Sequence, residues 1–225
     1  MKRFSTELAY VCGLFILAIG VAMMARSDFG VSMIVAPAYL LHLKLQPLFP
    51  FFTFGVAEYF VQAILLLGLT LLMRKFKFSY LMSFVTAILY GLLLDGATLI
   101  IELIPLVHPA VNLALYTVGL LFATCGISLL FHTYLSPEVY ELFVKEISAK
   151  TGWNINYCKT AYDILSCLVS IALSFLFFGF GHFEGIKFGT IFCAAVNGFC
   201  ISRFSRFFER RFVFEDSFPW RKWFE

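Results

Sequence analysis

Six apolar stretches of this chain are each long enough to cross a lipid bilayer. They lie at roughly 6–25, 51–73, 78–104, 111–133, 157–180 and 186–205. A helix needs about 20 mostly apolar residues to span the hydrocarbon core, and a helix satisfies its own backbone hydrogen bonds there. Hydrophobic residues make up 61% of the 225 residues and charged residues only 14%, so we expect no soluble domain of any size. The sequence therefore predicts an all-α fold, a polytopic membrane helix bundle with six transmembrane helices.

The Lys and Arg residues are distributed unevenly about these spans. If the N-terminus is cytoplasmic, the inner segments hold Lys2, Arg3, Arg74, Lys75, Lys77, Lys145, Lys150, Lys159, Arg203, Arg206, Arg210, Arg211, Arg221 and Lys222. These are 14 of the 17 basic residues, and the outer segments hold the other three, Arg26, Lys44 and Lys187. Because cytoplasmic loops carry an excess of Lys and Arg, the sequence predicts that both termini are cytoplasmic.

A spaced pattern of residues occurs twice. The run Tyr10-x2-Gly13-Leu14-x5-Gly20-Val21 returns 106 residues later as Tyr116-x2-Gly119-Leu120-x5-Gly126-Ile127, and Ser83-x6-Tyr90-Gly91 returns 107 residues later as Thr190-x6-Asn197-Gly198. Each copy holds three spans, and an odd number of spans gives the second copy the opposite orientation in the membrane. We therefore predict two inverted three-helix repeats, at 1–105 and 106–205, followed by a tail at 206–225. Inverted repeats are typical of many secondary transporters.

Each repeat also contains an apolar piece that is too short to span the membrane, at roughly 30–43 and 137–150. Asp28 can cap a short helix in the first piece, and Gly30 lets the backbone turn tightly. Ser136 and Pro137 form a typical helix start in the second. We predict a short re-entrant or interfacial helix in each half. Two interpretations stay open: the pieces line a central cavity, or they lie at the membrane surface.

Ionisable side chains within membrane spans are costly and are therefore candidates for function. Together with polar groups near the same depth, they give a candidate substrate or ion site made of Asp28, Ser32, Glu58, Tyr90, Asp95, Glu138, Tyr140, Asp163 and Asn197. Glu58 and Asp163 lie 105 residues apart, close to the repeat shift. The excess of acids over the one nearby base, Arg26, favours a cationic or zwitterionic solute, or coupling to protons or sodium. The alternative is that these acids lie near the interfaces and pair with bases and water.

Other features exclude several functions. The tail at 206–225 mixes Arg with Phe, which suits an anionic inner leaflet rather than a nucleic acid. The six cysteines form no CxxC pair, so we expect them to be packing residues without disulfides or metal. There is no Walker-type loop, HExxH or GxSxG motif. We therefore expect no catalytic residues, no cofactor and no enzymatic activity.

Three short motifs resemble the YczE/YitT-type bacterial membrane proteins, more closely the YczE-like branch. They are Ser27-Asp28-Phe29-Gly30-Val31-Ser32, Gly189-Thr190 with Asn197-Gly198, and Tyr90-Gly91 with Asp95. The first resembles that family's Asp-Leu-Gly-x-x-Pro stretch, although Met33 stands where a Pro-Trp pair is common. The resemblance covers nearly the whole chain. It implies a multi-pass protein of the bacterial cytoplasmic (inner) membrane with a role in transport, and it implies no substrate.

The sequence favours one function over two alternatives. We expect an integral inner-membrane protein that acts as a secondary transporter of a small cationic or zwitterionic solute, with a site at the repeat interface. Its partners are then the lipid bilayer and that solute. The first alternative is a substrate-capturing membrane subunit that needs an energising partner, and the second is a non-transporting scaffold or regulator. A homodimer or a partner subunit is compatible with each of these.

Overall fold

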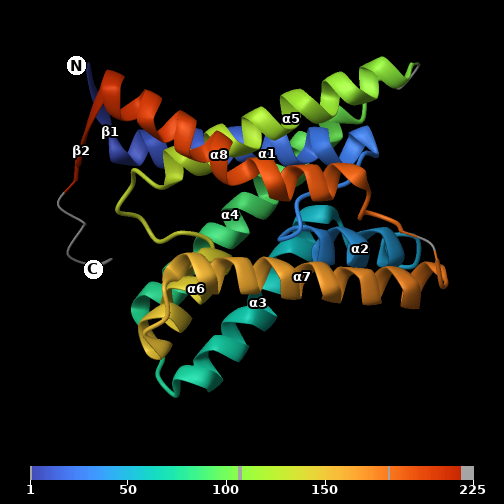
Figure 1. Ribbon diagram of the computed structural model, residues 1–225, viewed down its shortest axis with the longest axis horizontal. Helices are drawn as coiled ribbons and strands as arrows, with labels where there is room; N and C mark the ends of the chain where they lie inside the picture. The colour runs from blue at the N-terminus through green and yellow to red at the C-terminus, as the bar shows by residue number, and fades with distance from the viewer. Residues whose placement is uncertain (1, 106–107, 182, 219–225) are drawn as a thin grey trace.

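The computed structural model of this protein describes residues 2–105, 108–181 and 183–218. The described elements follow one another as β1 (Lys2–Ser5), α1 (Thr6–Ser27), α2 (Ala36–Leu45), α3 (Phe54–Met73), α4 (Phe78–Ile101), α5 (Pro109–Leu130), α6 (Val139–Thr151), α7 (Ile155–Phe178), α8 (Phe188–Arg211) and β2 (Phe212–Glu215). Figure 1 shows α1, α5, α7 and α8 running broadly along the molecule and α3 and α4 lying obliquely to them, with the shorter α2 and α6 toward opposite ends. The architecture is helical throughout, apart from the two four-residue strands.

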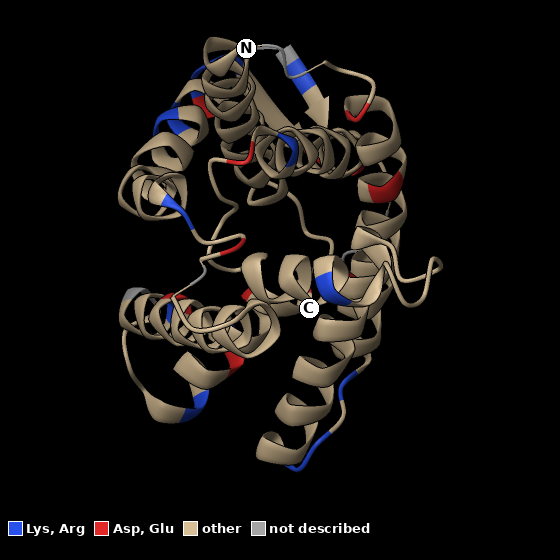
Figure 2. Ribbon diagram, turned by 90° about the vertical axis from the view of Figure 1, so that its right-hand side faces the viewer, with Lys and Arg blue, Asp and Glu red and all other residues tan. Residues whose placement is uncertain are grey.

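Six of the eight helices in the described part of the chain are long and apolar enough to cross a membrane. They are α1, α3, α4, α5, α7 and α8, and they coincide with the six predicted spans to within a few residues at most ends. The prediction of a polytopic membrane helix bundle is therefore confirmed. Figure 2 shows how few charged residues the long helices carry. Helix α8 extends about six residues beyond its predicted end, to Arg211, because no Gly or Pro interrupts the segment after Gly198.

The two short connecting pieces form α2 and α6. The first starts at Ala36, later than the sequence suggests. Asp28 and Gly30 have positive φ angles, of 58° and 110°, and a turn in which the Val35 and Ala36 N–H groups donate to the Ser32 carbonyl oxygen precedes the helix. The second starts at Val139 and ends at Gly152, whose φ of 72° is the usual left-handed stop. Each connecting piece therefore forms one short helix.

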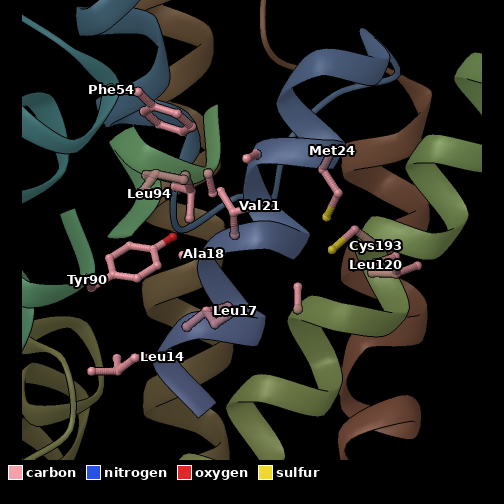
Figure 3. Packing of buried hydrophobic residues seen from close by; sticks show 14 of the residues in the cluster. Leu14, Leu17, Ala18, Val21, Met24, Phe54, Tyr90, Leu94, Leu120 and Cys193 are labelled. Atoms are coloured by element: carbon pink, nitrogen blue, oxygen red, sulfur yellow. The ribbon is translucent and has the colours of Figure 1, made fainter. Parts of the chain in front are cut away.

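The centre of the bundle is the crossing of α1 and α5, which run antiparallel. A Cβ atom placed on Gly126 would lie 2.6 Å from the Gly13 carbonyl oxygen, and one on Gly119 would lie 2.8 Å from that of Gly20. The helices thus approach to backbone contact, as small residues allow in membranes. Around this crossing α1 buries Leu14, Leu17, Ala18, Val21 and Met24 against residues of α4, α5 and α8 (Figure 3).

The remaining helices pack around this crossing. Helix α4 packs on α1, and α8 packs on α5. Helix α2 lies between α3 and α7, and α6 also contacts both α3 and α7. Helices α3 and α4 form a close interface, whereas within the described residues α7 and α8 form none of comparable extent.

The two ends of the described chain pair with each other, which the sequence patterns do not predict. Strand β1 runs parallel to β2, with Phe4 opposite Phe214, and the Phe4 ring centroid lies 5.3 Å from that of Phe212. The Glu7 carboxylate accepts hydrogen bonds from the Ser217 and Phe218 N–H groups at 3.1 and 3.0 Å. Residues 206–211 of the predicted tail are the last turns of α8, and Arg221 and Lys222 fall outside the described residues. Both ends of the described chain therefore lie at the same end of the bundle (Figure 1).

Candidate functional site

A cavity of about 80 Å³ lies where the two connecting segments approach the central helices. Its walls come from α1, α4, α5, α6, α7 and α8 and from the segment that precedes α2. Most of the lining is apolar, and the polar side chains in it are Ser32, Tyr90, Glu138, Tyr140, Glu141, Lys159 and Asn197. A concave, mainly apolar site with a few convergent polar groups is the usual form of a small-molecule site.

Two polar side chains of α3 hold the start of α6 beside this cavity. Gln62 accepts a hydrogen bond from the Val139 N–H at 3.1 Å, and its Nε2 donates to Glu138 Oε2 at 3.3 Å. One turn earlier, Glu58 accepts from the Tyr140 hydroxyl at 2.8 Å. Residues four apart share one face of a helix, so Glu58 and Gln62 act together. The network fixes Glu138 and Tyr140 at the cavity wall.

Glu58 lies behind this wall and is completely buried. One carboxylate oxygen bonds Tyr140, and the other, Oε1, has no hydrogen-bond partner. Within the described chain no Lys, Arg or His forms an ion pair with Glu58. Burying a neutral polar group without a hydrogen bond costs on the order of 2–7 kcal/mol, and burying a carboxylate without a cation costs more. Glu58 is therefore suited chemically to hold a proton or a small cation.

Glu138 borders the cavity itself. Burial raises the pKa of the Glu138 carboxyl to about 8, the negative charge of Glu141 acts in the same direction, and the hydrogen bond from Gln62 and the charge of Lys159 oppose it. A carboxyl with a pKa near 8 exchanges a proton around neutral pH. This part of the site can therefore change its charge under physiological conditions.

An ion pair between Glu141 and Lys159 closes the cavity on the side of α6 and α7. Lys159 Nζ lies 2.5 Å from Glu141 Oε1, and both side chains are about two-thirds buried. Lys159 is the one basic residue in the described cavity lining. Partial burial makes such a pair stronger than one on an open surface.

A second cavity of about 210 Å³ adjoins the first, between α7 and α8. The two share the lining residues Ser32, Ile34, Lys159, Cys193, Asn197 and Ile201. The second cavity adds Asp163, whose buried Oδ1 has no hydrogen-bond partner. The polar site thus extends from the centre of the bundle toward the open side between α7 and α8.

The structure brings most of the nine predicted site residues together. Those that line the first cavity are Ser32, Tyr90, Glu138, Tyr140 and Asn197. Asp163 lines the adjoining cavity, and Glu58 lies one hydrogen bond behind Tyr140. Glu141 and Lys159 also line the first cavity but were not among the nine. The spacing of Glu141 from Glu138, almost one turn of α6, is the signal that could have added it.

Asp28 and Asp95 lie outside both cavities. The Asp28 side chain is 67% exposed and forms an ion pair with Lys187 at 2.7 Å. Asp95 accepts hydrogen bonds from the Thr53 hydroxyl and the Gly55 N–H, each at 2.6 Å. Asp95 of α4 therefore caps the N-terminus of α3, where a negative charge and unpaired N–H groups complement each other. The geometry gives both acids a structural role.

The part of the chain that the structure describes contains no group of three His, Cys, Asp or Glu residues that could hold a metal ion. The six cysteines are unpaired and lie in or beside the helices. The polar groups that line the two cavities include side-chain oxygens, the Asn197 amide and the Lys159 ammonium group.

Comparison with known proteins identifies a family. No curated protein matches the chain, and no solved structure matches it. A family model described as a family of unknown function (DUF6198) matches residues 4–206, which include both cavities and nearly all of the six membrane helices. The chain therefore belongs to the DUF6198 family of unknown function.

Proposed function

We propose that this membrane protein is a secondary transporter of a small cationic or zwitterionic solute, which binds in the central cavity between two inverted repeats. One observation carries the proposal: the cavity lies where the connecting segments of both halves meet. Ser32 and Val35 come from the first segment, and Pro137 and Glu138 from the second. Transporters built from inverted repeats place their substrate sites at the repeat interface, where irregular backbone lines a cavity.

Crossed hydrogen bonds support the inverted relationship of the halves. Tyr10 and Tyr116 lie 106 residues apart. The Tyr10 hydroxyl forms a hydrogen bond of 2.8 Å with the Thr86 hydroxyl of α4, and the Tyr116 hydroxyl donates to the Gly189 carbonyl oxygen of α8 at 2.5 Å. Each of these helices then holds the connecting segment of the other half. The Thr86 hydroxyl donates to the Ser136 carbonyl at 3.0 Å, and the Gly189 N–H donates to the Phe29 carbonyl at 2.9 Å.

The helix contacts follow the same relationship. The packing of α1 on α4 corresponds to the packing of α5 on α8. The packing of α2 on α3 corresponds to the packing of α6 on α7. The packing of α2 on α7 likewise corresponds to that of α6 on α3. The antiparallel crossing of α1 and α5 then lies on the axis that relates the halves. These correspondences support a division of the bundle into two inverted units of three spans.

One pair of counterparts differs, and the difference supports alternating access. In the first half Gly55 of α3 meets Gly91 of α4 at backbone contact. Their counterparts at the repeat shifts are Thr160 and Gly198, and a Cβ atom on Gly198 would meet nothing within 4 Å. The side between α3 and α4 is thus closed, while that between α7 and α8 holds the second cavity. Two halves that exchange these arrangements would expose the site in turn.

The charges at the cavity support the solute class. Glu138 and Glu141 face one base, Lys159, and Lys159 is already paired with Glu141. Glu138 is therefore the acid that can pair with a cationic group once it releases its proton. Its pKa of about 8 also suits coupling to protons, with Glu58 as a second buried carboxyl nearby. We also propose that both termini are cytoplasmic, from the distribution of the basic residues. The short motifs support membership of a YczE-like branch and a location in the inner membrane.

A thermal-shift screen tests the proposal directly. Purified protein in detergent is heated with amines, amino acids and inorganic cations, and at 100 times its dissociation constant a ligand should stabilise the fold by about 2.7 kcal/mol. Asn197→Ala removes an amide from the wall of both cavities and should reduce this shift. Asn112→Ala, the same change in α5 away from both cavities, is the control. Equal shifts in the two variants, or none with any solute, would refute a solute site at this position.

A further inference from the structure

A third cavity lies between α5 and α8, apart from the candidate site. Its volume is about 420 Å³, and it is lined by Leu121, Phe199, Cys200, Arg203, Phe204, Arg206, Phe207 and Arg210. None of these residues lines either of the other two cavities. Figure 1 shows α5 and α8 crossing beside each other on the face away from α3. We call this cavity the arginine groove.

The three arginines of the groove lie on one face of α8, at positions separated by three and four residues. Their side chains are exposed, and no acid among the described residues forms an ion pair with any of them. The nearest acid in the helix, Glu209, instead bonds Ser205 and lies 3.9 Å from His132. Like charges at such spacings repel one another. A ligand with a negative charge would therefore relieve an unfavourable arrangement.

The groove changes from apolar to cationic along α8. Helix α8 begins at Phe188, so a rise of about 1.5 Å per residue places Arg203 about 22 Å and Arg210 about 33 Å along the axis. A hydrocarbon core about 30 Å thick then ends among the arginines, at the end of the bundle where β1 and β2 pair. Phe199 and Leu121 lie toward the core, and Arg211, 5.7 Å from the ring of Phe207, steadies that side chain.

We propose that the arginine groove binds an anionic phospholipid from the leaflet on the side of β1 and β2. The guanidinium groups of Arg203, Arg206 and Arg210 bind the headgroup phosphate, because their planar donors match phosphate oxygens in pairs. The phenylalanines and Leu121 contact the start of an acyl chain. Basic pockets between membrane helices suit such headgroups. This site is independent of the proposed transport function, since it shares no residue with the central cavity.

Lipid binding to the full-length protein tests this site. Detergent-purified protein is titrated with phosphatidylglycerol, phosphatidylcholine or inorganic phosphate, and bound lipid is counted by native mass spectrometry. Arg203→Gln, Arg206→Gln and Arg210→Gln combined should weaken phosphatidylglycerol binding by about 100-fold, if each arginine contributes about 1 kcal/mol. The matched control combines Arg74→Gln, Lys75→Gln and Lys145→Gln, which removes three exposed charges elsewhere and should change binding less than about threefold.

Three outcomes would overturn the proposal. Equal weakening by both triple variants would mean that overall charge alone attracts the lipid. Binding of phosphatidylcholine as tight as that of phosphatidylglycerol would remove the anionic headgroup as the ligand. Competition by millimolar inorganic phosphate that displaces the lipid fully would indicate a soluble phosphate site instead. If the triple variant does not fold, Arg206→Gln alone should weaken binding by about fivefold, and an unchanged affinity would count equally against the site.

Discussion

Replacing Gly20 with leucine is expected to prevent the folded protein from accumulating in the membrane. A Cβ atom at this position would lie 2.7 Å from the Gly119 carbonyl oxygen and 2.9 Å from the Ala123 Cα. Both obstacles are backbone atoms of α5, so they can give way only if the two central helices separate. Overpacking costs about 1–3 kcal/mol even where side chains can adjust, and we expect a larger loss here. Yield and melting temperature in detergent measure the effect.

Gly96→Leu is the matched control for this prediction. Gly96 lies in α4, is exposed, and a Cβ atom there would meet nothing within 4 Å. Leucine favours a helix over glycine by about 0.5–1 kcal/mol, so this variant should be as stable as the wild type or slightly more so. A Gly20→Leu protein that melts like Gly96→Leu would contradict the backbone contact between α1 and α5 on which the arrangement of the halves depends.

Glu138→Gln is expected to flatten the dependence of stability on pH. The folded protein keeps a proton on Glu138 up to about pH 8, whereas an unfolded chain releases it near the ordinary value of 4.5. The stability contributed by this proton is therefore fully present below about pH 4.5 and is lost as pH rises through about 8. The loss is on the order of a few kcal/mol. Glutamine stays neutral, so the variant should melt at a higher temperature than the wild type above pH 8.

Melting curves from pH 4 to pH 9 check this result. Glu102→Gln is the control, because Glu102 is an exposed acid at the end of α4 and its neutralisation should leave the slope unchanged. Parallel curves for wild type and Glu138→Gln would mean that the carboxyl is ionised and solvated. In that case Glu138 could not serve as the exchangeable acid of the site.

The helical spans could be predicted from the sequence because a single physical requirement dominates them. A run of about 20 apolar residues has few alternatives to a membrane helix, and all six runs became helices of that length. The start of α2 was harder to predict, since left-handed backbone at Asp28 and Gly30 and a turn at the Ser32 carbonyl precede it and leave no periodic signal. The pairing of β1 with β2 joins segments about 210 residues apart and is too short to leave a periodic signal.

The site was predictable in composition and less so in geometry. The cost of burying an ionisable group indicated Glu58, and the repeated pattern indicated Tyr90 and Asn197. All three lie in or just behind the cavity wall. The argument from burial cost also indicated Asp95, because sequence position does not reveal whether a carboxylate within a span faces a cavity or the N–H groups of another helix. Lys159 was predicted as an inner-segment base and was not assigned to the site, because its partner Glu141 lies on a different helix. Both outcomes depend on tertiary contacts.

The measurement that tests the central claim most directly is the accessibility of a cysteine at position 197. In a protein whose six native cysteines are replaced, Asn197→Cys is treated with a membrane-impermeant maleimide from each side of sealed, oriented vesicles. The claim that the cavity opens in turn to both sides predicts labelling from either side, whereas Asn112→Cys near one end of α5 should react from one side only. Labelling of position 197 from one side alone, or from neither, would contradict alternating access to this cavity.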